Sequence, residues 1–337
     1  MINRTQMRGP RGHACYVNRG AAALWLLVTA ALIGASGSAP AQSGRTIRIV
    51  VPVPPGGAGD ILARQLAEQV GQARGVSIVV ENRAGAGTII GSEAVAHAAP
   101  DGNTLLLNAP YLLISAQLRK VNYDPLTSFA PLCYLVSSPG LIVVNSASPY
   151  RTLGDLVQAA RTRPGEITMA SVGPGTAQHI GFEMLRRAAE VDLTYVPYAG
   201  GAPAINALLG NHVTSVFAEY APLSAHLKAG TLRALATSSK TRIASLPDVP
   251  TVAESGYDDY EVDLWWGLFA PAKTPNATLA QLGGWFNDAM EVPAMQAKLA
   301  ALGFSPGGVC GADFAVLLRK QYDAYGRIIR AANIKAE

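Results

Sequence analysis

The chain has 337 residues, of which 49% are hydrophobic and 15% are charged, with 34 glycines, 22 prolines and three cysteines. This composition excludes a disordered chain, a collagen or coiled coil, and a small fold held together mainly by disulfides. Four arginines before residue 42 supply the net charge of +4, because without them the 27 basic residues become 23 and balance the 23 acidic ones. The charge therefore gives no argument for binding nucleic acid.

Residues 1–41 predict a secretory signal peptide. Arginines precede the apolar run 21–33, and Ala39-Pro40-Ala41 forms an A-x-A cleavage pattern. The apolar run is short for a membrane-spanning helix, so an uncleaved anchor is the weaker alternative. No cysteine stands at the cleavage point, which argues against a lipoprotein. We therefore expect an exported, periplasmic protein with 1–41 removed.

Two cysteines, Cys133 and Cys310, lie beyond the leader. An oxidising compartment allows them to form one disulfide. The alternative is two separate, partly buried thiols, and the sequence leaves both open.

Short apolar runs alternate with helical patterns along the rest of the chain. The expected strands are 47–53, 76–80, 104–107, 141–144, 167–171, 193–196, 213–217, 232–236 and 267–270. The expected helices, with apolar residues every three to four positions, are 60–70, 153–161, 177–189, 203–209, 221–228 and a long one over 313–332. This alternation predicts an α/β protein whose parallel sheets are covered by helices on both faces.

The block 142–246 holds a complete run of alternating strands and helices. We expect it to form one domain, inserted into another domain that combines residues 42–141 with 247–337. The two chain crossings would then form a hinge beside a cleft, which is where ligands usually bind.

Glycine-rich turns follow two of the expected strands. Pro54-Pro55-Gly56-Gly57 stands between the first strand and the first helix, and Tyr198-Ala199-Gly200-Gly201 has the same place in the middle block. Glycines let the backbone approach a ligand closely, and the N–H groups at a helix start favour an anion. Two such loops facing each other predict a clamp for a carboxylate. The alternative is that they only turn the chain between strand and helix.

A third glycine segment, residues 171–179, also joins a strand to a helix. The hydroxyls of Ser171 and Thr176 could donate to an anion, or Thr176 could simply cap the helix. His179 follows in the first turn of that helix. A fourth segment, 81–91, lacks the spacing of a dinucleotide-binding fingerprint, so we expect no nucleotide there.

Enzyme and metal-site motifs are missing. The sequence contains no G-x-S-x-G, H-E-x-x-H, C-x-x-C or Walker A pattern, and its histidines lack metal-ligand spacing. We therefore expect no catalysis, no cofactor and no metal. Asp60 is expected to stabilise the start of its helix rather than to bind a ligand. Trp265-Trp266 is expected to pack in the core rather than stack on a ligand.

Seven segments carry a resemblance to a known family in their order and spacing. They are PPGG at 54–57 with Asp60, VVENR at 79–83, APDG at 99–102, VPYAGG at 196–201, LRALA at 232–236, LPDVPT at 246–251 and GLFAP at 267–271. Together they resemble the Bug-type periplasmic solute receptors, the substrate-binding proteins of tripartite tricarboxylate transporters. The resemblance covers the chain after the leader. It implies a two-domain, periplasmic-binding-protein (Venus-flytrap) fold, in which each domain is a mostly parallel sheet flanked by helices.

The resemblance also implies ligand-binding residues on both domains. In the first domain these are Pro54, Pro55, Gly56, Gly57, Ala86, Gly87, Asn108 and Ala109. In the second they are Ser171, Gly175, Thr176, His179, Tyr198, Ala199, Gly200, Gly201, Ala218 and Glu219. Many members have Phe-Asp-Asn where this chain has Phe217-Ala218-Glu219, and that aspartate faces the ligand in members that bind an amino group. Ala218 therefore argues against an amino acid and for a bulkier or more apolar carboxylate, although Glu219 could partly substitute.

The expected function is a non-catalytic periplasmic receptor, working as a monomer. It would capture a small organic carboxylate, aromatic or dicarboxylic, and deliver it to the membrane subunits of a tripartite tricarboxylate transporter. One alternative is a subunit that presents the same ligand to a membrane sensor kinase. A less favoured alternative is a secreted enzyme that uses Asp60 or His179 in acid–base chemistry. The ligand itself cannot be identified from backbone-rich loops.

Overall fold

The computed structural model describes residues 45–262 and 264–335, and the predicted signal peptide lies outside them. The described part of the chain is α/β, as predicted, and forms two separate sheets. None of the helices in the described ranges has both the length and the apolar character that crossing a bilayer requires.

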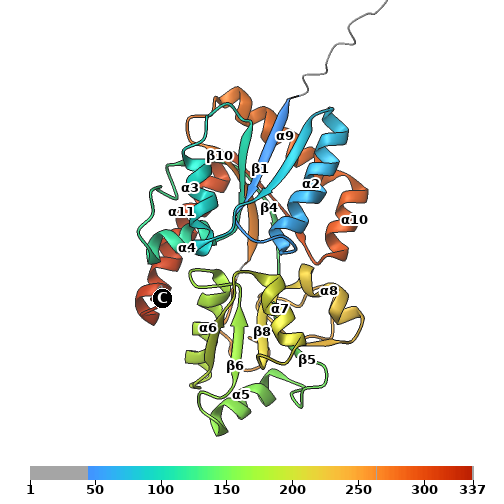
Figure 1. Ribbon diagram of the computed structural model, residues 1–337, viewed down its shortest axis with the longest axis vertical. Helices are drawn as coiled ribbons and strands as arrows, with labels where there is room; N and C mark the ends of the chain where they lie inside the picture. The colour runs from blue at the N-terminus through green and yellow to red at the C-terminus, as the bar shows by residue number, and fades with distance from the viewer. Residues whose placement is uncertain (1–44, 263, 336–337) are drawn as a thin grey trace, which may run out of the picture. The chain divides into compact units, whose positions relative to one another are not determined.

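The first sheet has six strands in the order β11-β4-β10-β3-β1-β2 (Figure 1). They are β1 (Thr46–Val51), β2 (Ser77–Asn82), β3 (Thr104–Asn108), β4 (Phe129–Ser137), β10 (Trp265–Pro271) and β11 (Ser305–Cys310). β1 pairs parallel with β2 and β3, whereas β10 pairs antiparallel with β3 and β4, and β11 pairs antiparallel with β4. The expectation of a mostly parallel sheet is wrong here, because the late strands β10 and β11 return in the opposite direction.

The second sheet has five strands in the order β7-β6-β8-β5-β9. They are β5 (Gly140–Asn145), β6 (Thr168–Ser171), β7 (Thr194–Pro197), β8 (Ser215–Glu219) and β9 (Leu232–Thr237). This sheet is also mixed, since β6 pairs parallel with β7 and β8 while β5 pairs antiparallel with β8 and β9. The chain passes between the sheets after β4 and again after β9. Domain boundaries at 142 and 246 stay a prediction.

Helices cover both sheets (Figure 1). Those of the first are α2 (Ala58–Arg74), α3 (Ile89–Ala96), α4 (Tyr111–Leu118), α9 (Asn276–Glu291), α10 (Pro293–Ala301) and α11 (Gly311–Ala332), with the short 3-10 helix η1 (Ala86–Thr88) before α3. Those of the second are α5 (Leu153–Thr162), α6 (Ala177–Ala188), α7 (Gly201–Leu209) and α8 (Tyr220–Lys228). α2 also contacts α8, and α11 contacts both α4 and α6. These helices therefore join the parts of the protein built on the two sheets.

Cys133 and Cys310 form a disulfide, which decides the alternative that the sequence leaves open. The two residues stand opposite each other in the antiparallel pair of β4 and β11. The bond links β11, which follows the α9–α10 helices, to a strand inside the first sheet. Trp265 and Trp266 on the neighbouring strand β10 are buried, as expected.

Candidate functional site

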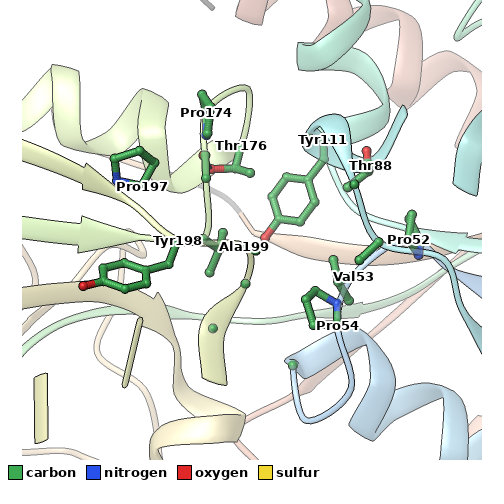
Figure 2. A pocket seen from close by; sticks show the side chains of 18 of the residues that line it. Pro52, Val53, Pro54, Thr88, Tyr111, Pro174, Thr176, Pro197, Tyr198 and Ala199 are labelled. Atoms are coloured by element: carbon green, nitrogen blue, oxygen red, sulfur yellow. Dashed lines mark hydrogen bonds between the residues drawn. The ribbon is translucent and has the colours of Figure 1, made fainter. Parts of the chain in front are cut away.

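A cavity of about 450 Å³ is lined by loops from both sheets. Loops and helices of the first sheet contribute Pro52, Val53, Pro54, Gly57, Ala58, Ala84, Gly85, Ala86, Gly87, Thr88, Tyr111, Arg119 and Trp266. The second sheet contributes Val172, Gly173, Pro174, Thr176, Pro197, Tyr198, Ala199, Gly200, Gly201, Glu219 and Pro222. Figure 2 shows side chains of the first group facing Pro174, Thr176 and Pro197 of the second. Most of these residues directly follow a strand and precede a helix.

The loop between β1 and α2 is held in shape by Asp60. The Gly56 N–H donates to Oδ2 of Asp60 at 3.0 Å, and Arg64 donates to both carboxylate oxygens at 3.1 and 2.9 Å. Burial acts to raise the pKa of Asp60, but the hydrogen bonds from Arg64, Gly56 and Asn82 outweigh it and hold this pKa below its usual value. Asp60 therefore shapes the loop from behind and is not in the cavity wall. Pro54 and Gly57 line the cavity, whereas Pro55 and Gly56 do not.

The turn before α3 has four successive residues with positive φ. These angles are 137° at Gly85, 49° at Ala86, 65° at Gly87 and 77° at Thr88. An alanine and a β-branched threonine are strained in this region, and such strain gathers at ligand sites. Ser115 of α4 supports the turn by donating to the Gly87 carbonyl at 2.6 Å. The predicted residues Ala86 and Gly87 line the cavity.

The segment between β6 and α6 uses its hydroxyls within the protein. Thr176 caps α6, since its Oγ accepts from the His179 N–H at 3.3 Å and donates to the Gly173 carbonyl at 2.7 Å. Ser171 Oγ lies 2.7 Å from the Tyr195 hydroxyl. The His179 ring packs on Tyr195 with centroids 4.5 Å apart. Of the predicted residues here, Thr176 lines the cavity, whereas Ser171, Gly175 and His179 do not.

The loop between β7 and α7 places all four predicted residues, Tyr198 to Gly201, in the cavity wall. The Tyr198 hydroxyl points away from Tyr111 (Figure 2). A Cβ on Gly200 would lie 2.7 Å from Pro54 Cγ, and one on Gly87 would lie 2.9 Å from the Pro174 carbonyl oxygen. The loops of the two sheets therefore touch at two places beside the cavity.

Three further predicted residues lie behind the wall. Asn108 is buried, where its Nδ2 donates to Ser92 Oγ at 3.0 Å and its Oδ1 accepts from the Ala109 N–H at 2.8 Å. Ala218 is fully buried in β8 opposite Leu141 of β5. Asn108, Ala109 and Ala218 therefore do not reach the cavity, because strand pairing and α3 enclose them.

Glu219, the last predicted residue, lines the cavity although it is only 5% exposed. Its Oε2 accepts from Trp266 Nε1 at 2.7 Å and from Ser138 Oγ, and its Oε1 accepts from the Tyr111 hydroxyl at 3.3 Å. Burial raises the pKa of Glu219, and the bonds from Ser138, Trp266 and Tyr111 reduce that rise. Burial likewise raises the pKa of Tyr111. The carboxyl group is therefore a polar point in an otherwise apolar part of the wall.

Fourteen wall residues are outside the predicted set, and three of them have large side chains with polar atoms, namely Tyr111, Arg119 and Trp266. Tyr111 and Arg119 stand at the two ends of α4, which is apolar on most sides and shows no helical stripe in the sequence. Trp266 is in the core as expected, but its indole N–H also reaches Glu219. The basic pair Arg119-Lys120 directly after an apolar segment is the one signal that could have pointed to Arg119.

Two helix-covered sheets with a cavity between their loops define a two-lobed ligand-binding protein. A family model described as "Tripartite tricarboxylate transporter family receptor" (TctC) matches residues 62–334, and the chain belongs to this family. Protein BugT of Bordetella pertussis is 33% identical over 288 residues, covering 85% of this chain and 88% of BugT. The resemblance to Bug-type receptors is therefore confirmed.

Solved structures agree with this assignment. The periplasmic binding protein BugD aligns with a TM-score of 0.83 at 32% identity, over 87% of this chain and 99% of BugD. Rpa4515 of R. palustris, solved with adipate, aligns with a TM-score of 0.82 at 29% identity, over 86% of this chain and 98% of Rpa4515. The protein is a solute-binding receptor of the periplasmic-binding-protein fold.

Proposed function

We propose that this receptor captures a small organic carboxylate in the cavity and delivers it to the membrane subunits of a tripartite tricarboxylate transporter. The observation that carries the proposal is the convergence of four glycine-rich loops and Arg119 on one cavity. The adipate in Rpa4515 supports a carboxylate as the ligand class.

The physical basis is an excess of hydrogen-bond donors and positive potential. α2, α6 and α7 all begin at loops of this cavity, with Gly57, Thr176 and Gly200 as their N-caps. The N-terminus of a helix attracts an anion through its free N–H groups and its dipole. Arg119 adds a full positive charge. A carboxylate held by loops of both lobes stabilises the closed arrangement, because only that arrangement supplies every donor.

The predicted residues then divide into two groups. Ligand contacts are assigned to those in the wall, which are Pro54, Gly57, Ala86, Gly87, Thr176, Tyr198, Ala199, Gly200, Gly201 and Glu219. Pro55, Gly56, Asn108, Ala109, Ser171, Gly175, His179 and Ala218 are assigned to holding those loops in place. Asp60 acts with the second group through Gly56.

The finer biology is proposed on the same basis. The leader 1–41 is cleaved on export to the periplasm, the receptor works as a monomer, and domains 42–141 plus 247–337 and 142–246 close on the ligand. Its partners are transporter membrane subunits rather than a sensor kinase, and it carries out no catalysis. Copurification of the membrane partner, and loss of ligand uptake when the gene is deleted, test the transport role.

The ligand class is tested with residues 42–337 in a calorimetric and thermal-shift screen of carboxylates against neutral solutes. At least one carboxylate is expected to bind with a Kd below about 1 mM. Arg119→Gln should weaken that binding about tenfold or more, because a charge-assisted contact is lost. The exposed Arg151 gives a matched control, since Arg151→Gln removes the same charge away from the cavity wall. Binding of neutral solutes together with no binding of any carboxylate would refute the proposal.

A further inference from the structure

The cavity wall has one basic and one acidic side chain. Of its described residues, Arg119 is the basic one and Glu219 the acidic one. Arg119 comes from the end of α4 and Glu219 from the end of β8. One anionic group on a ligand would be matched by Arg119 and the helix starts, whereas a second would meet a wall without another cation.

Glu219 accepts hydrogen bonds from three side chains of the protein. Trp266 Nε1 can only donate, and it donates to Oε2 together with Ser138 Oγ. Oε1 accepts a bond of 3.3 Å from the Tyr111 hydroxyl. A carboxylate oxygen can accept two hydrogen bonds, so Oε1 has capacity for another donor.

A second buried polar group, the side-chain amide of Gln178, lies beside this carboxyl and is not in the cavity wall. It interacts with Glu219 and lowers the pKa of that carboxyl. Within the wall it is therefore the Glu219 carboxylate, rather than this amide, that suits a donor on a ligand.

Much of the rest of the wall is apolar. Five prolines at positions 52, 54, 174, 197 and 222 line it, together with Val53, Val172 and the Trp266 ring. Such a surface favours a hydrocarbon body on the ligand. It also makes an unpaired charge costly, because these side chains offer it neither a hydrogen bond nor an opposite charge.

We infer that the cavity selects a monocarboxylate with an apolar body and a hydrogen-bond donor at its far end, which Glu219 accepts, and that Glu219 disfavours dicarboxylates. This inference rests on the proposed function, since it assumes that a carboxylate binds. It sets this chain apart from Rpa4515, whose structure holds the dicarboxylate adipate. Glu219 is thus assigned to discriminate between ligands that share the bound carboxylate and differ only at their other end.

Two matched series of probes test the inference by calorimetry at about pH 8 and fixed ionic strength. One series is hexanoate, 6-hydroxyhexanoate and adipate, and the other is benzoate, 4-hydroxybenzoate and terephthalate. In the first series the sixth carbon is a methyl, a hydroxymethyl or a carboxylate group, and in the second the para position of the ring carries hydrogen, a hydroxyl or a carboxylate. In at least one series the hydroxy acid should bind most tightly and the diacid about tenfold or more weaker, because its second charge lies near Glu219.

Variants then separate the charge of Glu219 from its packing. Glu219→Gln should strengthen diacid binding about tenfold relative to the hydroxy acid, since the repelling charge is gone. Ser138→Ala is the matched control, because it removes one hydrogen bond to Glu219 and leaves the charge, so the preference should persist. Circular dichroism and melting temperature show whether each variant folds. If Glu219→Gln does not fold, the ranking in the wild-type protein decides alone.

The outcomes distinguish this inference from the function on which it rests. A diacid that binds as tightly as the hydroxy acid overturns the inference, as does a folded Glu219→Gln variant with an unchanged preference. Failure of all six probes while another carboxylate binds also overturns it and leaves the proposed function standing. Failure of every carboxylate in the wider screen refutes the proposed function itself.

Discussion

Replacement of Gly200 by alanine is expected to weaken ligand binding by holding the Gly200 loop and the Pro54 loop apart. Gly200 precedes α7 with φ 146° and ψ 177°, a conformation that is almost confined to glycine. A Cβ at this position would lie 2.7 Å from Cγ and 2.8 Å from Cδ of Pro54. Carbon atoms in contact are normally about 3.5–4.0 Å apart, so the loops would have to separate by roughly 1 Å.

The magnitude follows from two separate costs. Overpacking of this kind costs about 1–3 kcal/mol, and it acts only where the Pro54 loop and the Gly200 loop are in contact. If closure requires that contact, Kd rises about 5- to 150-fold, since 1.4 kcal/mol corresponds to a factor of ten. The backbone strain, about 1–3 kcal/mol, is present with and without ligand. It therefore lowers the melting temperature of the free protein instead.

The assay is calorimetry with the tightest-binding carboxylate of the screen. Gly256→Ala is the matched control, because Gly256 also has a positive φ of 102° but is outside the cavity wall, and a Cβ there would have no neighbour within 4 Å, so affinity should change little. Pro54→Ala removes Cγ and Cδ, so the double variant should recover part of the affinity lost in Gly200→Ala. The reasoning is wrong if Gly200→Ala binds like Gly256→Ala, or if the effects of Gly200→Ala and Pro54→Ala simply add.

Two further predictions concern stability. Asp60→Asn removes the charge that accepts from Gly56 and Arg64. The pKa of Asp60 in the folded protein lies below its ordinary value of 3.8. The stability that this charge contributes is therefore present above pH 3.8 and is lost as the pH falls through the folded pKa. Urea unfolding should therefore show a deficit of about 1–3 kcal/mol near pH 6 that shrinks towards pH 3, and a deficit independent of pH would contradict this. Cys133→Ser combined with Cys310→Ser opens a link across 177 residues and should lower the unfolding free energy by about 2–5 kcal/mol in the same assay. Ligand affinity should stay unchanged, since neither cysteine is in the cavity wall, and an unaltered urea midpoint would show that the bond is not stabilising.

Elements with a strong local pattern could be predicted from the sequence, and those without one could not. The strand-turn-helix units around 46–60 and 194–201 are encoded within about fifteen residues by an apolar run, glycines and the start of a helical stripe. β11 has the sequence SPGGVC, whose proline and glycines are depleted in strands, so only its pairing with β4 and the disulfide make it one. α3 and α4 are apolar on most sides, and this hides the helical period.

The candidate site likewise has some features that are local in the sequence and others that are not. Its glycine loops are local features, and their backbone donors suit many different anions, so they define a class of receptor rather than one ligand. The charged groups are not local, because Arg119 and Glu219 are a hundred positions apart and the partners of Glu219 come from α4, β10 and the crossing after β4. Only the folded topology brings these groups to one cavity. If Glu219 binds the far end of the ligand as inferred, ligand specificity depends on side chains that folding brings beside the glycine-rich loops. Receptors with similar loops can then differ in the carboxylate they bind.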